Sequence, residues 1–153
     1  MDSNSSLIYK RVKKIVHKFD TNDPFEIAKE SNIKVKYFND ATILLGMYTA
    51  IERNRFIYLN PKMEEYMMRM VISHELGHDT LHRHLTKNNP FYEYELFDIT
   101  SQAEYEANIF ASHLLIDDDQ VIELIKNNYT DVEIASFLNV NVNLLIFKMN
   151  EMN

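Results

Sequence analysis

The segment with the clearest chemical potential is His74-Glu75-Leu76-Gly77-His78, which has the pattern H-E-x-x-H. In a helix, residues four apart lie on one face on successive turns, so the imidazoles of His74 and His78 can bind one metal ion. Glu75 projects in a neighbouring direction, where its carboxylate can take a proton from an attacking water without binding the metal. The pattern predicts a hydrolytic zinc site with two histidine ligands and Glu75 as general base. The alternative is a surface helix with two solvated histidines.

A catalytic zinc ion normally takes a third protein ligand and keeps one position open. Glu104 and Asn108 lie four residues apart in a predicted helix, so they share a face. There a carboxylate can complete the zinc shell, and the amide one turn later can orient a ligating histidine. Glu106 projects from nearly the opposite side, so both glutamates cannot reach one ion. A second interpretation stays open, because Ser101-x-x-Glu104 is also a capping box in which Glu104 would only cap its own helix.

The helix that carries the histidines should end near His82, which continues the spacing of four beyond His78. His82 lies about 6 Å further along the helix axis, at about 1.5 Å per residue, so we expect a structural role for it and no metal bond. Gly77 lies between the two predicted ligands, in a helix interior where glycine costs up to about 1 kcal/mol relative to alanine. We interpret it as a sign of close packing against that turn.

The composition limits the classes of protein that this chain can represent. The 153 residues are 46% hydrophobic and 25% charged, which is typical of a globular domain. The absence of cysteine excludes disulfides, cysteine nucleophiles and cysteine zinc ligands. The formal charge of −7 argues against a general nucleic-acid binder. We see neither a signal-peptide pattern nor an apolar run of membrane-spanning length, so we expect one cytoplasmic domain over residues 1–153 with no membrane or nucleic-acid partner.

Hydrophobic periodicity predicts an α+β fold that is mainly helical, with a small, mostly antiparallel three-stranded sheet. The predicted helices cover residues 6–19, 25–31, 62–82 or 84, 101–115, 118–127, 131–138 and 142–149, and the predicted strands cover residues 33–38, 43–51 and 55–59. Helix starts are indicated by Asp23 before Pro24, by Asp117, and by the capping box Thr130-x-x-Glu133.

Two segments near the predicted site could contact a substrate. An extended peptide can pair with an exposed sheet edge, and the strand at 46–51 or 55–59 could offer that edge. Residues 85–99 are predicted to form a loop rich in aromatic side chains. These aromatic side chains could cover the core or line a substrate cleft, and the sequence does not choose between the two.

The two motifs together resemble the ImmA/IrrE family of zinc metallopeptidases. That family has the pattern H-E-[LI]-x-H followed by E-x-E-A-N-x-F-A-x-x-L-L, which residues 74–78 and 104–115 match. The resemblance covers about residues 24–117 and implies a zincin-like core of the gluzincin type there. Residues 118–150 would form a C-terminal helical segment, and within it the resemblance is only loose.

The resemblance also implies roles for individual residues. His74, His78 and Glu104 would hold one Zn²⁺ ion, Glu75 would be the general base, and Asn108 would support a ligating histidine. The chain departs from the family in two places. Asp117 follows the leucine-rich end of the second motif where many members have proline, and His113 stands where an acidic residue is common.

The implied function is that of a zinc-dependent endopeptidase, an anti-repressor protease that cleaves a helix-turn-helix repressor of a phage or integrative element. The oxyanion of such a reaction needs a further hydrogen-bond donor. Four side chains are candidates, and the sequence does not choose among them: Tyr48, Tyr92, Tyr94 and His113.

Two other functions stay open. The chain could be a non-catalytic regulator that contains zinc and docks to a transcription factor. Residues 130–149 could also form a DNA-binding helix pair, although Lys148 is the only basic residue of the would-be recognition helix, which is poor for phosphate contact.

Overall fold

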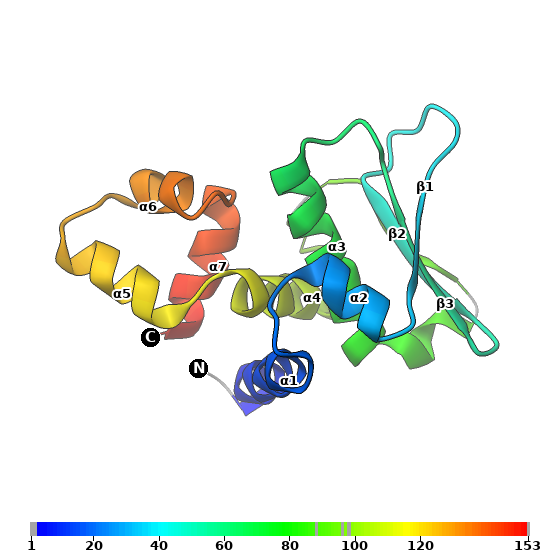
Figure 1. Ribbon diagram of the computed structural model, residues 1–153, viewed down its shortest axis with the longest axis horizontal. Coiled ribbons are helices and arrows are strands. Elements are labelled where there is room, and N and C mark those ends of the chain that lie inside the picture. The colour runs from blue at the N-terminus through cyan, green and yellow to red at the C-terminus, as the bar shows by residue number, and fades with distance from the viewer. Residues whose placement is uncertain (1–2, 88, 96, 98, 153) are drawn as a thin grey trace.

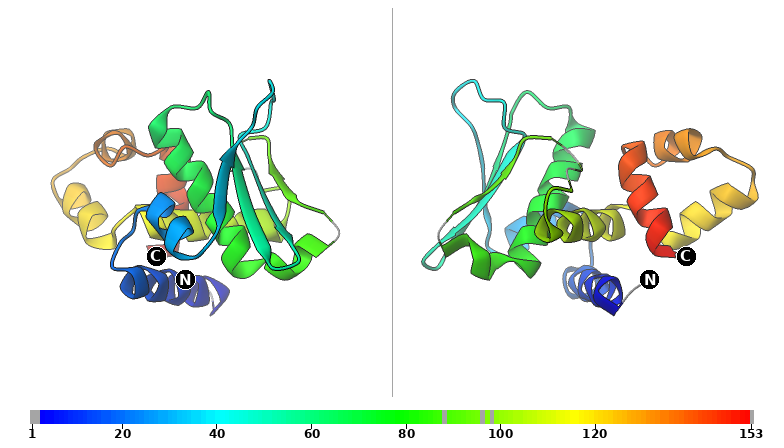
Figure 2. Two further views of the ribbon diagram at one scale, coloured as in Figure 1. Left: turned by 45° about the vertical axis from the view of Figure 1, so that its right-hand side comes forward. Right: turned by 180° about the vertical axis from the view of Figure 1, so that it is seen from behind.

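The computed structural model describes residues 3–87, 89–95, 97 and 99–152. These residues form seven α-helices, one 3-10 helix and four strands (Figure 1). In chain order they are α1 (Ser3–Phe19), α2 (Pro24–Glu30), β1 (Lys34–Tyr37), β2 (Gly46–Ile51), β3 (Asn54–Leu59), α3 (Glu65–Leu81), the 3-10 helix η1 (Arg83–Lys87), β4 (Phe91–Glu93), α4 (Gln102–Leu115), α5 (Asp118–Lys126), α6 (Asp131–Phe137) and α7 (Val142–Met152). The sheet lies at one end of the molecule and α5, α6 and α7 at the other, with α3 and α4 between them (Figures 1 and 2).

The sheet is mixed and has the strand order β1-β3-β2-β4. β2 and β3 form the expected antiparallel hairpin, β1 runs parallel to β3, and β4 is antiparallel to β2. The predicted number of three strands is therefore wrong. Two of the three strand pairings are antiparallel, as predicted, and the pairing of β1 with β3 is parallel. β4 lies inside the segment 85–99 that was predicted to be a loop. The sequence did not predict this strand because three residues are too few to show an alternating pattern. The direction of β1 depends on pairing with β3 rather than with β2, its neighbour in sequence.

Capping residues mark the starts of three helices at the predicted positions. The Asp23 side chain accepts the backbone N–H groups of Phe25 and Glu26 at the start of α2, with Pro24 in the first turn. Asp117 caps α5 in the same way. Thr130 and its partner Glu133 form the predicted capping box of α6. These starts are confirmed because a cap needs only residues within one turn of the chain.

Two hydrophobic clusters hold the elements together. The first joins the sheet to α1, α2, α3 and α4, and its members include Val12, Ile27, Ile57, Val71 and Phe110. The second joins α3 and α4 to the C-terminal helices, and its members include Met70, Ala111, Val121, Ile134 and Leu145. Each fully buried aliphatic side chain of this kind contributes about 1.5–3 kcal/mol. Because α3 and α4 belong to both clusters, they form the frame on which the site is built.

The two glycines of the chain both allow α3 to approach a neighbour closely. A Cβ atom on Gly77 would lie 3.0 Å from Ala107 Cα on α4. A Cβ atom on Gly46 of β2 would lie 2.6 Å from Val71 Cγ1 and 2.9 Å from Glu75 Oε1, both on α3. The prediction that Gly77 marks close packing is confirmed, and Gly46 does the same between α3 and the sheet.

Within the described residues, no single helix is both long and apolar enough to cross a membrane; only α6 and α7 taken together, a pair bent by 109°, pass on length and composition.

Candidate metal centre

Helix α3 buries all three candidate site residues of its motif. His74, Glu75 and His78 expose 1%, 0% and 1% of their surface. Ionisable side chains are rarely buried this completely unless they are paired or bind a metal. The alternative of two solvated histidines on a surface helix is therefore wrong.

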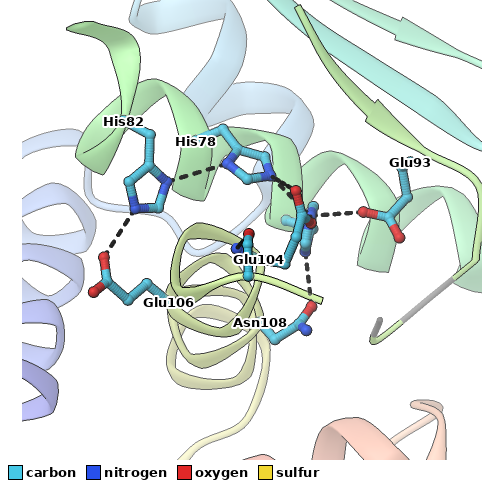
Figure 3. A network of polar contacts seen from close by, with 8 residues as sticks. His78, His82, Glu93, Glu104, Glu106 and Asn108 are labelled. Atoms are coloured by element: carbon cyan, nitrogen blue, oxygen red, sulfur yellow. Dashed lines mark hydrogen bonds and ion pairs between the residues drawn. The ribbon is translucent and has the colours of Figure 1, made fainter. Parts of the chain in front are cut away.

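Glu104 on α4 reaches both histidines (Figure 3). His74 Nε2 lies 3.0 Å from Glu104 Oε2 and 3.0 Å from His78 Nε2, and His78 Nε2 lies 3.5 Å from Glu104 Oε1. Ligand atoms around tetrahedral zinc lie about 3.3 Å apart when each metal–ligand distance is about 2.0–2.1 Å. The spacing of these three side chains, called the triad below, therefore fits a metal ion of this kind.

The capping alternative for Glu104 accounts for its backbone and not for its side chain. Ser101 Oγ accepts the Glu104 backbone N–H at 3.2 Å and caps α4. The Glu104 carboxylate meanwhile points to the histidines of α3. The two functions are compatible because the serine supplies the cap.

Asn108 lies one turn after Glu104 and contacts the other side of the His74 ring. Asn108 Oδ1 accepts a hydrogen bond from His74 Nδ1 at 2.8 Å. The ring proton of neutral His74 is therefore on Nδ1, which leaves a lone pair on Nε2 facing a carboxylate. Lone pairs that converge in this way need a cation between them, either a proton or a metal ion. The donor set of two imidazoles and one carboxylate fits a divalent transition-metal ion such as zinc.

His78 is held from behind by a second chain of contacts that leads to the surface. His78 Nδ1 lies 3.1 Å from His82 Nδ1, and His82 Nε2 lies 2.9 Å from Glu106 Oε2 (Figure 3). With a metal on His78 Nε2, the proton of that ring must be on Nδ1, so His82 accepts it and donates its own Nε2–H to Glu106. As predicted, Glu104 and Glu106 point in different directions: Glu104 contacts His74 and His78, and Glu106 contacts His82. His82 contacts a predicted ligand and not the triad centre.

Glu75 lies beside the triad with an unsatisfied carboxylate. Both of its oxygens are buried and have no hydrogen-bond partner among the described residues. Burial raises the pKa of Glu75 well above its usual value; the positive charge of His74 opposes this rise, and the carboxylates of Glu93 and Glu104 add to it. A buried acceptor without a partner costs free energy, so it is a candidate for a role that a ligand or water completes.

Glu93 on β4 belongs to the site and was missed from the sequence. It is 3% exposed, and its Oε2 atom lies 2.6 Å from His74 Nε2, although that oxygen makes no hydrogen bond among the described residues. Figure 3 shows Glu93 approaching from the side opposite His82. Because Glu93 lies in the predicted loop 85–99, the sequence does not indicate which way its side chain points. The one available signal was an acid between Tyr92 and Tyr94, which is weak.

The carboxylates and imidazoles of the site shift one another's protonation. Burial alone would lower the pKa of His74, but hydrogen bonding to Glu104 and contact with Glu93 outweigh it and raise that pKa well above the usual value. Burial lowers the pKa of His78 to about 4, helped by the charge of His74. Burial opposes ionisation of Glu104, yet contact with both histidines lowers its pKa to about 2. The site thus concentrates negative charge around one metal-sized position.

The four oxyanion candidates lie in different places. The Tyr48 hydroxyl donates to Asp79 Oδ1 at 2.7 Å and is buried, with burial and the carboxylate raising its pKa. His113 lies nine residues after Glu104 on α4, about 13 Å along the axis, so it is far from the triad. Tyr92 and Tyr94 are 46% and 59% exposed. Tyr92 points to the sheet face opposite Glu93, because neighbouring residues of a strand alternate.

The predicted aromatic loop contributes to both the site and the core. Phe91 stacks on His78, with ring centroids 3.9 Å apart and planes 11° apart. Phe97 instead packs against Phe147 of α7, at 6.2 Å between centroids. Phe97 therefore agrees with the interpretation that these aromatics cover the core, whereas Phe91 contacts a proposed metal ligand, and a substrate cleft stays a prediction.

Comparison with known proteins agrees with this geometry. A peptidase family model described as the IrrE N-terminal-like domain matches residues 28–150. The chain is also 33% identical over 130 residues to uncharacterized immunity region protein 2 of Bacillus phage phi105, a match that covers 85% of this chain and 81% of the phage protein. The matched region contains the triad, Glu75, Glu93 and Asn108. The chain therefore belongs to the ImmA/IrrE family of metallopeptidases.

Proposed function

We propose that this chain is an endopeptidase that uses one Zn²⁺ ion. The observation that carries the proposal is the convergence of His74 Nε2, His78 Nε2 and the Glu104 carboxylate beside the unpartnered carboxylate of Glu75. When bound at the triad, zinc supplies a Lewis acid and lowers the pKa of a water molecule. His74, His78 and Glu104 would hold the ion, and three protein ligands would leave room for that water.

The residues of the chain would divide the remaining work. Glu75 takes a proton from the attacking water and delivers it to the nitrogen of the leaving amine. Its burial favours this role, because burial raises the pKa of the Glu75 carboxyl and makes its carboxylate a stronger base than an exposed one. Asn108 and His82 accept the Nδ1 protons of His74 and His78, so that both Nε2 lone pairs face the triad centre.

The proposed substrate is a helix-turn-helix repressor of a phage or integrative element, cleaved at one position to relieve repression. The support is the family together with the similarity to a protein of a phage immunity region. The reaction would take place in the cytoplasm, where such a repressor acts.

The experiment incubates the zinc-loaded chain with each helix-turn-helix repressor encoded by the same genetic element. We expect one specific cleavage in the wild type and a loss of roughly 10²–10⁴-fold in rate for Glu75→Gln, the usual contribution of a general base. The exposed Glu95→Gln is the matched control and should cleave normally. Zinc content, measured by atomic emission, should be equal in all three proteins.

The same experiment separates the rival function. A non-catalytic regulator that docks to a transcription factor would act fully in the Glu75→Gln form, and that result would overturn the peptidase proposal. DNA binding has less support. The bend of 109° between α6 and α7 resembles a helix-turn-helix, but Lys148 is 1% exposed and paired with Asp118, so it cannot contact phosphate.

A further inference from the structure

The candidate metal centre is closed, and β4 closes it. His74, Glu75 and His78 expose at most 1% of their surface. The Phe91 ring lies flat on His78, and the Glu93 carboxylate lies against His74. A peptide that is hydrolysed here must reach both the triad and Glu75, since the attacking water lies between them. In this arrangement β4 side chains take that space.

β4 also occupies the sheet edge that an extended substrate would use. It pairs antiparallel with β2 through the residue pairs Gly46–Glu93, Met47–Tyr92 and Tyr48–Phe91. Because side chains alternate along a strand, Phe91 and Glu93 point to the site while Tyr92 points away. An extended peptide that adds to a sheet edge uses the same backbone groups and presents alternate side chains in the same way. β4 therefore stands where a substrate strand would stand, with Glu93 inserted like a substrate side chain.

The contact between β4 and α3 brings a further carboxylate into the site. The Glu93 carboxylate is buried against His74, where the carboxylates of Glu75 and Glu104 also lie. Both Glu75 oxygens have no hydrogen-bond partner within the described residues, whereas Glu93 Oε2 forms an ion pair with His74 Nε2 at 2.6 Å. β4 is three residues long and makes three residue pairs with β2. A strand this short can be displaced by a longer extended segment that pairs with the same edge of β2.

We propose that the β2 edge at Gly46–Tyr48 is the binding surface for an extended peptide and that β4 is its internal occupant, which must leave before a substrate can enter. This inference rests on the proposed peptidase function and adds its regulation: the chain is held latent by its own strand, with Phe91 and Glu93 as the residues that block the site.

A reversible disulfide tests the displacement directly, because the chain has no cysteine of its own. Met47→Cys with Tyr92→Cys joins directly opposed residues of β2 and β4 on the face away from the triad. The control pair, Ile51→Cys with Asn54→Cys, joins β2 to β3 and leaves β4 free. The probe is a fluorescent peptide hydroxamate, which binds the metal and needs an extended site.

We expect the oxidised β2–β4 variant to bind the probe at least about 10-fold more weakly than its reduced form, because the competent state is no longer populated. The control pair should bind equally in both redox states, and zinc content should be the same throughout. Equal binding by the oxidised and reduced β2–β4 variant would overturn the proposal. So would failure of the zinc-loaded reduced form to bind the probe.

Glu93→Gln tests the same contact without a cross-link, with Glu95→Gln two residues away as matched control. We expect Glu93→Gln to bind the probe several-fold more tightly than the wild type at unchanged zinc content. Weaker probe binding by Glu93→Gln would overturn the proposal, because Glu93 would then support the open site. Probe binding requires no cleavage, so its outcome is independent of whether Glu75→Gln abolishes repressor cleavage.

Discussion

Helix α4 carries two buried groups of charged side chains, one near its start and one near its end, and they are built in opposite ways. Near the start, Glu104 faces His74 and His78, with Glu75 and Glu93 alongside. Near the end, His113 faces Lys148 and Asp118, which we call the lysine cluster. The Lys148 ammonium pairs with Asp118 and donates to His113 Nδ1 at 3.1 Å. His74, Glu75, His78, His113 and Lys148 are all buried, whereas Asp118 is about one-third exposed, so the two groups differ in burial as well as in charge.

The two groups differ in their balance of cationic and anionic side chains. In the cluster one ammonium faces one carboxylate, and His113 is neutral because burial, aided by Lys148, lowers its pKa to about 4. At the metal centre, three carboxylates surround two imidazoles, and no lysine or arginine of the described residues pairs with any of these five side chains. Burying unpaired charge costs several kcal/mol per ion. The first arrangement balances one ammonium with one carboxylate, whereas the second gathers three carboxylates around two imidazoles and could hold an added metal ion.

The largest expected effect comes from removing the proposed third ligand of the candidate metal centre. Glu104→Gln should weaken zinc binding by more than about 100-fold, beyond the loss typical of residues that only support a ligand. Competition with a chromophoric chelator measures it. The backbone cap from Ser101 is unaffected by this change, so circular dichroism of the zinc-free protein should match the wild type.

Glu106→Gln makes the same chemical change two residues later. It tests whether Glu106 only supports a proposed ligand, whereas Glu104 is itself a proposed ligand. We expect zinc affinity to fall by about 10–100-fold, because His82 loses the acceptor that fixes its proton and, through it, the orientation of His78. The same chelator competition applies. A greater loss for Glu106→Gln than for Glu104→Gln would show that the assignment of the helix faces is wrong.

The lysine cluster should make the free energy of unfolding depend on pH. The pKa of His113 is about 4 in the folded protein and 6.5 in the reference state. Its stabilising contribution is therefore complete above pH 6.5 and is lost as pH falls toward 4, by at most about 3 kcal/mol. His113→Gln keeps an acceptor for Lys148 and removes the titration, so urea unfolding should depend less on pH in this window. The exposed His17→Gln is the control and should follow the wild type.

The smallest effect tests the packing that brings α3 and α4 together at the metal centre. Gly77→Ala gains about 1 kcal/mol of helix propensity but places a Cβ atom 3.0 Å from Ala107 Cα and 3.2 Å from its backbone oxygen. Backbone atoms cannot move aside cheaply, so we expect a net loss of about 1–2 kcal/mol in the free energy of unfolding. Ser136→Ala, at an exposed position of α6, should stay within about 0.5 kcal/mol of the wild type. Equal stability of the Gly77→Ala protein would argue against tight packing at this crossing.

The features that the sequence predicted well depend on residues close together in the chain. The helix boundaries follow from caps at Asp23, Asp117 and Thr130, each of which acts within one turn. Glu104 and Asn108 could be placed on one face because helical spacing is regular. Glu93 could not be placed, because its position depends on the pairing of a three-residue strand with β2, a contact between segments that are more than forty residues apart.

The sequence alone therefore determined which residues could act together. Because the period of the α-helix is fixed, one helix must present His74 and His78 on the same face. A second helix must likewise present Glu104 and Asn108 on the same face. Only the tertiary structure decided which groups actually meet. It turned Glu106 to His82, Tyr48 to Asp79 and His113 to Lys148, and it brought Glu93 over His74. These contacts depend on how whole elements pack, and packing is set by the summed burial of many side chains rather than by any local spacing.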